Sequence, residues 1–185
     1  GDSPVTRIGA EGGRWRLACP RGTVTARRLI LATNGYSSEN LPRWLAGRYL
    51  PTQSNILVTR ELTDDELAAQ GWTSRQMCYD TRYHLHYFRL LPENRMMFGV
   101  RGRVRSSAEV WAETRAAARA DFERIFPAWA GVETPHFWQG LLCLSRKLTP
   151  FVGPVPGMDG AFAAFAYHGN GVAMGALAGR MVADL

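Results

Sequence analysis

The sequence has little lysine, little cysteine and no long hydrophobic run. Of its 22 basic residues all but Lys147 are arginine. Its 3 cysteines, Cys19, Cys78 and Cys143, are far apart and form no Cys-x-x-Cys pair, so we expect free thiols in a reducing compartment. The long uncharged stretch at 162–179 is interrupted by a histidine, an asparagine and several glycines, which argues against a membrane-spanning helix.

What the chain does contain is typical of one ordinary domain or two small ones. Its 185 residues are 46% hydrophobic and 11% aromatic, which is enough to bury a core and excludes a mainly disordered chain. With 22 basic and 16 acidic residues the formal charge is +6. The arginines are scattered, and Arg101, Arg103 and Arg105 are too few to follow a nucleic-acid backbone. We therefore expect no nucleic-acid partner and, from the thiols, a cytoplasmic location.

The pattern of apolar residues predicts strands and helices along the whole chain. Strands are expected where apolar residues alternate or run together between turn residues, at 14–33, 55–60, 83–101, 136–144 and 161–167. A short helix is expected to begin at the capping box Thr63 to Glu66 and to end at Gly71, a long one to begin at Ser106, and a third at Val172. The continuous apolar run 29–32 is typical of a strand covered on both faces.

A glycine-rich turn, His168-Gly169-Asn170-Gly171, joins the last predicted strand to the last predicted helix. Gly171, Gly175 and Gly179 are four residues apart, so we expect this helix to pack closely against a sheet. Its first N–H groups lie at the positive end of the helix dipole, where they can stabilise an anion or a developing negative charge. The same motif is also compatible with a purely structural turn.

Other candidate groups carry less chemistry. His84 and His86 alternate on one predicted strand, but no carboxylate or cysteine stands at suitable spacing, so we expect no metal site. No serine lies in a Gly-x-Ser-x-Gly turn, which leaves hydrolase chemistry without support. Lys147 is the one basic side chain that can lose its proton, and it is either a surface cation or a catalytic group.

Five short motifs carry a resemblance that extends over almost the whole chain. They are Arg28-Leu29-Ile30-Leu31-Ala32-Thr33-Asn34-Gly35-Tyr36; Tyr87-Phe88-Arg89 with Arg95-x-x-Phe98-Gly99; Trp138-x-Gly140; Thr149-Pro150-x-x-Gly153-x-x-Pro156; and His168-Gly169-Asn170-Gly171-Val172-Ala173 with Leu177-Ala178-Gly179-Arg180. In order and spacing they resemble the C-terminal half of flavoproteins of the D-amino-acid oxidase and glycine oxidase type. Within that superfamily the chain most resembles the gamma-glutamylputrescine oxidoreductase branch.

The resemblance implies an α+β fold. A mixed, largely antiparallel sheet with flanking helices forms the substrate domain, accompanied by C-terminal pieces of an α/β FAD-binding domain. The implied domains are a partial FAD-binding domain at 1–45, a substrate-binding domain at 46–148 and the C-terminal part of the FAD-binding domain at 149–185. The family's N-terminal strand–Gly-x-Gly-x-x-Gly–helix, which holds the ADP part of FAD, has no counterpart here. We therefore expect a fragment that is inactive alone and whose FAD binding depends on the rest of the protein.

The resemblance also implies a reaction. Family members oxidise a C–N bond to an imine by hydride transfer to FAD, and O₂ or another acceptor reoxidises the flavin. A helix N-terminus near the flavin ring stabilises the negative charge of its reduced form. FAD is expected to be non-covalent, because Leu144, and not Cys143, stands where some relatives attach it. The implied cofactor-binding residues are Ala32, Thr33, Gly169, Asn170, Gly171, Val172 and Ala173.

The substrate class is suggested by one departure from the family. Amino-acid oxidases of this type often carry an arginine four residues after the tryptophan of Trp-x-Gly, where it binds the substrate carboxylate. Here that position is Leu142, and a carboxylate left unpaired in a dry pocket is costly. We therefore expect an amine or N-alkyl substrate in preference to a free α-amino acid, unless Arg89 or Arg146 replaces the arginine. The expected substrate-binding residues are Arg89, Arg146, Leu142 and His168, with Tyr87 and Lys147 as catalytic residues.

Two functions remain open from the sequence. The first is an FAD-dependent oxidoreductase that acts on a small-molecule amine, of which this chain is a part. The second is a non-catalytic module of the same ancestry that binds a small molecule or a protein without flavin. A strand–Gly-x-Gly-x-x-Gly–helix elsewhere in the parent reading frame, with an acidic residue about 20 positions on, favours the enzyme.

Overall fold

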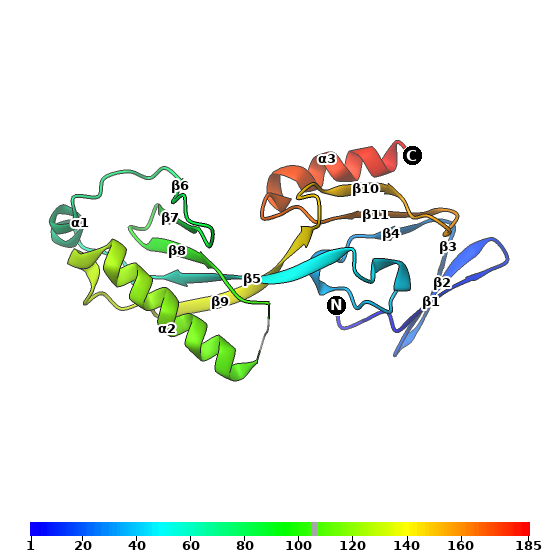
Figure 1. Ribbon diagram of the computed structural model, residues 1–185, viewed down its shortest axis with the longest axis horizontal. Helices are drawn as coiled ribbons and strands as arrows, with labels where there is room; N and C mark the ends of the chain where they lie inside the picture. The colour runs from blue at the N-terminus through cyan, green and yellow to red at the C-terminus, as the bar shows by residue number, and fades with distance from the viewer. Residues whose placement is uncertain (105–106) are drawn as a thin grey trace. The chain divides into compact units, whose positions relative to one another are not determined.

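The computed structural model describes residues 1–104 and 107–185 and divides into two compact units (Figure 1). Unit 1 comprises Gly1–Pro51 and Leu142–Leu185, and unit 2 comprises Thr52–Leu141. Two long strands, β5 (Tyr49–Val58) and β9 (His136–Ser145), contain the points where the chain passes from one unit to the other. Arg105 and Ser106, which the sequence assigns to a basic run and a helix cap, lie outside the described residues.

Unit 1 contains two three-stranded sheets. The first is an antiparallel meander of β1 (Arg7–Glu11), β2 (Arg14–Cys19) and β3 (Gly22–Ala26). The second has the order β10–β11–β4, from β10 (Phe151–Pro154), β11 (Ala161–Phe165) and β4 (Leu29–Leu31). In it β11 pairs antiparallel with β10 and parallel with β4. The indole N–H of Trp15 joins the two sheets by donating to the carbonyl of Asp159 at 3.2 Å.

The strands of unit 1 differ from the expectation in two ways. The single strand expected after the first turn is two strands, because β3 pairs with β2 whereas β4 pairs with β11 in another sheet. The expectation that the run 29–32 is covered on both faces is also wrong. Leu29 and Leu31 are buried, but the side chain between them, Ile30, is 56% exposed. Only one face of β4 is therefore packed within the described chain.

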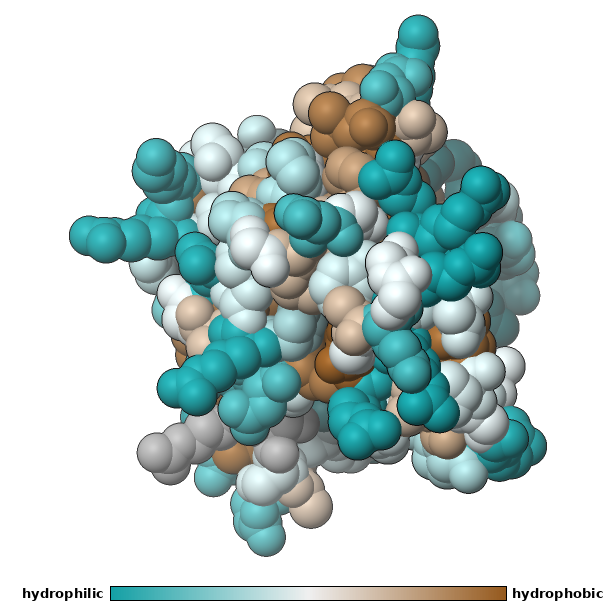
Figure 2. All heavy atoms as spheres, turned by 90° about the vertical axis from the view of Figure 1, so that its right-hand side faces the viewer, coloured by the Kyte–Doolittle hydropathy of each residue, from teal (hydrophilic) through white to brown (hydrophobic). Residues whose placement is uncertain are grey.

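The C-terminal helix α3 (Gly171–Ala183) packs on the second sheet of unit 1 through Ala178 and Val182, which are buried with Ala164. The expected close approach through Gly175 and Gly179 is wrong, because a Cβ at either position meets no described atom within 4 Å. Other large apolar side chains of this segment are exposed: Leu177 and Met181 of α3 and Leu185 after it. Figure 2 shows apolar side chains gathered at the top of the face it draws.

Short helical turns complete unit 1. Ala32 and Thr33 join β4 to the 3₁₀ turn η1 (Asn34–Tyr36). A second turn, η2 (Arg43–Leu45), precedes β5. Leu45 is buried with Trp15 and Phe165 in the core of this unit. No helix in the described parts of the chain is both long and apolar enough to cross a membrane.

Unit 2 is built on a five-stranded sheet of order β6–β7–β8–β5–β9. It contains β6 (Cys78–Tyr79), β7 (His86–Leu90) and β8 (Met96–Arg101). The predicted hairpin between 83 and 101 is confirmed, with β7 and β8 antiparallel and Tyr87 opposite Gly99. Together with the sheets of unit 1 and three helices, this confirms the α+β class.

The helices of unit 2 begin where side chains cap them. In α1 (Asp64–Gln70) the predicted capping box is present: Thr63 Oγ1 accepts from the Glu66 N–H at 3.2 Å, and Glu66 Oε2 accepts from the Thr63 N–H at 2.9 Å. Gly71 ends this helix in the left-handed region, as predicted. The long helix α2 (Ala108–Ile125) is capped by Ser107, whose hydroxyl accepts from the Val110 N–H.

One face of the sheet in unit 2 is covered by α2 and the turn η3 (Pro127–Trp129). Phe122 and Trp129 are fully buried there with Phe98 of β8. Because side chains alternate along a strand, the neighbours of Phe98 point to the other face of the sheet. That second face, which we call the open face, carries Ser54, Ile56, Tyr87, Arg89, Met97, Gly99 and Arg101.

Candidate functional site

The parallel strands β4 and β11 end at the same edge of their sheet. Their register places Leu31 opposite Ala163. Ala32 and Thr33 follow β4, and the turn 166–170 follows β11 and leads into α3. We call residues 32–34 and 166–173 the carboxyl edge. Carboxyl ends of parallel strands are the usual place for a cofactor in α/β sheets.

Asn34 ties the two strand exits together. Its Oδ1 accepts a hydrogen bond from the backbone N–H of Ala166 at 3.2 Å, across 132 residues of sequence. The backbone of both residues lies in the left-handed region, with φ of 48° at Asn34 and 66° at Ala166. Asparagine tolerates this conformation, whereas alanine rarely adopts it. Residues with this kind of strained backbone are common at ligand sites, where the surrounding contacts hold them in place.

The turn between β11 and α3 continues in the left-handed region, with φ of 57° at His168 and 101° at Gly169. The His168 N–H donates to the carbonyl of Cys143 at 3.3 Å, and its Nε2 lies 3.4 Å from Ser145 Oγ. Ser145 Oγ in turn donates to the carbonyl of Thr149 at 2.8 Å. The end of β9, the following turn and His168 are therefore linked by hydrogen bonds.

The start of α3 offers backbone donors. Asn170 occupies the N-cap position, and in the described chain its side chain makes no capping hydrogen bond. Val172 is 100% exposed and Ala173 is also exposed. The first N–H groups of α3 therefore lie at the positive end of the helix dipole, in an exposed part of the described chain. This donor set fits the electron-rich edge of a flavin ring.

The other predicted residues of unit 1 lie along the end of β9 and the turn after it. Leu142 is half-buried, whereas Arg146 and Lys147 are exposed. Cys143 is buried, and this burial raises the pKa of its thiol to about 11. The three cysteines are free thiols, and Cys143 is held in its unreactive, neutral form.

On the open face of unit 2, Tyr87 packs over a glycine. A Cβ at Gly99 would lie 2.0 Å from Tyr87 Cε2, so only glycine leaves room for the ring above β8. The Tyr87 hydroxyl lies 2.6 Å from Ser54 Oγ on β5. Burial raises the pKa of Tyr87 more than the Ser54 hydrogen bond and the positive charge of Arg101 lower it. The phenol therefore stays protonated near neutral pH and can donate a hydrogen bond.

Arg89 shares this face but extends to a different neighbour. It is exposed, and its Nε donates to the carbonyl of Arg75 at 3.2 Å. The structure thus groups Tyr87 with Ser54 and Arg101, two residues that the sequence analysis did not assign to the site. The period-two alternation of β8 places Arg101 on the face of Gly99, and this signal was available in the sequence.

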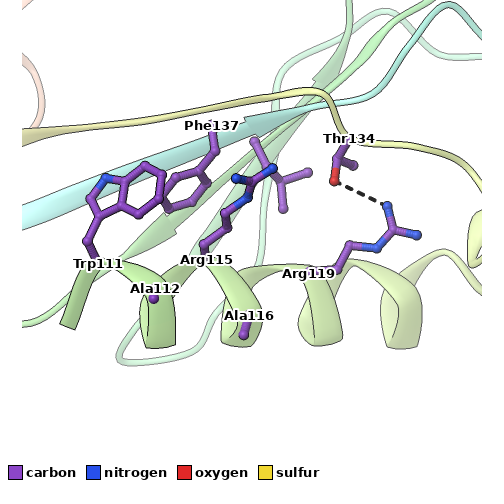
Figure 3. A pocket seen from close by; sticks show the side chains of 8 residues that line it. Trp111, Ala112, Arg115, Ala116, Arg119, Thr134 and Phe137 are labelled. Carbon is purple, nitrogen blue, oxygen red and sulfur yellow. Dashed lines mark hydrogen bonds between the residues drawn. The ribbon is translucent and has the colours of Figure 1, made fainter. Parts of the chain in front are cut away.

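A groove of about 420 Å³ lies between α2 and the sheet, beside β9 (Figure 3). Trp111 and Phe137 form its aromatic wall. The guanidinium carbon of Arg115, Cζ, lies 5.9 Å from the centroid of the Trp111 ring. Arg119 donates to Thr134 Oγ1 at 3.3 Å (Figure 3). None of the residues predicted to bind substrate or cofactor lines this groove.

Comparison with known proteins matches the chain to the family described as FAD dependent oxidoreductase over residues 1–185. The chain is 31% identical over 179 residues to the probable oxidoreductase OrdL of Rhizobium meliloti (strain 1021), covering 97% of this chain and 40% of that protein. It is 29% identical over 166 residues to gamma-glutamylputrescine oxidoreductase of Escherichia coli (strain K12), covering 89% and 38%. The chain therefore spans about two fifths of these relatives.

Solved structures share the fold at low sequence identity. Glycine oxidase from Geobacillus kaustophilus aligns with 99% of this chain and 47% of its own, with a TM-score of 0.75 and 19% identity. Fructosyl amine:oxygen oxidoreductase (Amadoriase I) from Aspergillus fumigatus aligns with 97% of this chain and 44% of its own, with a TM-score of 0.75 and 14% identity. The resemblance inferred from the five motifs is confirmed.

Proposed function

The chain belongs to the family of FAD-dependent oxidoreductases, and on that premise we propose that the whole protein oxidises the C–N bond of an amine to an imine by hydride transfer to FAD. The proposed substrate is gamma-glutamylputrescine-like or another N-substituted amine. The observation that carries this proposal is the carboxyl edge, where Asn34 joins two parallel strand ends beside the uncapped start of α3.

At the carboxyl edge the chain contributes backbone groups. A bound FAD would supply the hydride acceptor, with O₂ or another acceptor as its oxidant. The N–H groups of Gly171, Val172 and Ala173 would stabilise negative charge at the N1–C2=O edge of the ring. Ala32 and Thr33 lie at the end of β4, where their small side chains let a cofactor approach the backbone. A non-covalent cofactor agrees with the neutral, buried thiol of Cys143.

The open face of unit 2 would contribute to substrate binding. The hydrogen-bonded hydroxyls of Tyr87 and Ser54 leave one O–H to donate to a substrate, and the Tyr87 ring offers an aromatic wall. Leu142 brings no charge to the position where related amino-acid oxidases carry arginine, which favours an amine over a free α-amino acid. We further propose that Lys147 assists reoxidation and that His168 and Arg146 contact the substrate. A Lys147→Met enzyme with unchanged reoxidation would remove Lys147 from this list.

The test is the visible absorption spectrum of the protein expressed from its complete reading frame. Putrescine-like amines are then added under anaerobic conditions, with glycine and D-alanine as comparison substrates. Flavin bands that bleach with the amines support the proposal, and strong turnover of the amino acids contradicts the substrate class. A folded, colourless protein that takes up no added FAD would instead support the non-catalytic binding module.

A further inference from the structure

We infer that the groove between α2 and the sheet of unit 2 is a binding site for a small aromatic carboxylate, whose ring packs against Trp111 and Phe137 and whose carboxylate binds Arg115. All the residues that line the groove belong to unit 2. None of them has a role in the proposed reaction, so this inference goes beyond the proposed function and does not depend on it.

One side of α2 forms the first wall of the groove. Trp111, Arg115 and Arg119 follow one another at intervals of four residues and therefore lie along the same side of the helix. Figure 3 shows their side chains extending from α2 toward β9. Ala112 and Ala116 lie beside this row, and their short side chains leave the space open. The volume of about 420 Å³ falls within the range of roughly 300–1,000 Å³ that is typical of small-molecule sites.

The apolar part of the groove is mainly aromatic. The ring centroids of Trp111 and Phe137 are 5.1 Å apart, and the ring planes meet at 82°. Both side chains are only partly buried within the described chain, and the buried Leu57 of β5 adds to the apolar lining. A planar ring can join such an edge-to-face pair through further edge-to-face or offset contacts. The lining therefore favours a ligand with an aromatic body.

Arg115 brings a charge that the described chain does not neutralise. Its one recorded contact in residues 1–104 and 107–185 is with the Trp111 ring, at a distance within the limit of about 6 Å for a cation–π interaction. This contact requires no hydrogen-bond acceptor, so the N–H donors of Arg115 remain available. Two nearby acids of α2, Glu113 and Glu123, are each paired with a different arginine. Arg115 is exposed and can therefore receive a ligand.

The second cation of the groove is already engaged. Arg119 Nε donates to Glu123 Oε1 at 2.7 Å, and its other nitrogens donate to Thr134 Oγ1 and to the carbonyls of Ala130 and Val132. Among the described residues that line the groove there is no carboxylate. A ligand thus meets one unpaired guanidinium and no negative charge. A guanidinium stays protonated at physiological pH, and its planar fork matches a carboxylate, so the polar group of the ligand is an anion.

The experiment uses the full-length protein and two matched probes, 2-naphthoate and the neutral 2-naphthamide, in calorimetric titrations. Wild type is expected to bind 2-naphthoate about tenfold more tightly than 2-naphthamide, a ratio typical of one charge-assisted contact. Arg115→Gln is expected to remove this preference by weakening the binding of the carboxylate alone. Arg124→Gln should keep it, because Arg124 is an exposed arginine of α2 that does not line the groove. An unchanged number and affinity of 2-naphthoate sites in Arg115→Gln overturns the inference.

A second pair of variants tests the shape of the site. Ala116→Leu fills the groove and is expected to weaken 2-naphthoate binding at least about tenfold. Ala117→Leu adds the same side chain at an exposed position outside the groove and should leave the affinity unchanged. Leucine is nearly as good a helix former as alanine, and melting temperatures check that both variants are folded. Equal affinities in wild type and the two folded variants contradict the inference. The titrations involve no flavin reduction, so their outcome is separate from that of the proposed function.

Discussion

The Nδ1 atom of His86 lies 2.6 Å from Oδ2 of Asp80. The other ring nitrogen, Nε2, lies 3.1 Å from Oδ2 of Asp121 on α2, and the histidine is only 2% exposed. Carboxylates accept hydrogen bonds and do not donate them, so each ring nitrogen of His86 faces an acceptor. The buried His86 ring therefore joins Asp80 to Asp121 and ties β7 to α2, one residue before Tyr87. We call these three residues the triad.

The triad makes Asp121 a stabilising residue. We expect Asp121→Ala to lower the free energy of unfolding by about 1–3 kcal/mol, because it leaves the buried Nε2 of His86 without its hydrogen-bond partner. Arg124→Ala is the matched control, since it removes only the surface pair between Arg124 and Asp121. Urea unfolding of the two variants measures the difference. Equal losses would show that the contact with His86 contributes nothing beyond that surface pair.

Acid should weaken the N-terminus of α1. The side-chain hydrogen bond from Arg60, with the backbone hydrogen bond from Thr63, lowers the pKa of Glu66 to about 2. A carboxyl whose pKa is lowered in the folded protein stabilises it above its unfolded pKa, and this stabilisation is lost as the pH falls. Between pH of about 4.5 and about 2, the melting temperature of wild type should fall more steeply than that of Glu66→Gln. Parallel curves would contradict this.

The close contact between Gly99 and Tyr87 predicts a compensating pair. Gly99→Ala places a methyl group where the Tyr87 ring lies, and we expect it to destabilise the protein by about 1–3 kcal/mol. Combined with Tyr87→Ala, the same change should cost much less, because the obstructing ring is gone. A double-mutant cycle on thermal unfolding measures this coupling. Additive losses would mean that Gly99 is required for another reason.

Asn34 should control cofactor binding through the carboxyl edge. We expect Asn34→Ala to lower stability by about 1 kcal/mol and to weaken FAD binding in the full-length protein, because Ala166 loses its acceptor and alanine is strained at a φ of 48°. Asn34→Gly keeps the backbone conformation and loses only the hydrogen bond, so it separates the two causes. Flavin fluorescence during dilution measures the release of FAD. Unchanged release in both variants would remove Asn34 from the site.

Some parts of the fold follow from residues that are close in sequence. The capping box of Thr63 and Glu66 closes over four residues, and Gly71 ends the same helix. The hairpin that pairs Tyr87 with Gly99 follows from alternation on both sides of one turn. The motif at His168 likewise indicates a strand, a turn and a helix in the order found. The strands β1 and β10 escaped prediction, because short, partly exposed segments carry little periodicity.

The candidate site depends more on contacts between distant residues. The four-residue spacing of glycines in α3 predicts close packing along the glycine face. The face that packs on the sheet is instead the one with Ala178 and Val182, which are buried there. Ile30 sits in a continuous apolar run and is nevertheless exposed, since burial depends on what covers a strand. The assignment of residues 1–45, 46–148 and 149–185 to cofactor and substrate domains stays a prediction, as do the roles of Lys147 and His168.

The sequence by itself determined the helix caps, the central hairpin and the family, because these depend on spacing within short segments and on the order of motifs. Only the tertiary structure decided that Asn34 holds Ala166, that His86 lies between two carboxylates, and that Arg101 stands beside Tyr87 and Ser54. Asn34 and Ala166 are 132 residues apart, and His86 is 6 and 35 residues from its two carboxylates. Arg101 and Ser54 are 47 residues apart (101 − 54). The alternation of residues along a strand determines which face of the sheet a side chain points to. Which residues it meets on that face depends on how the rest of the chain folds around it.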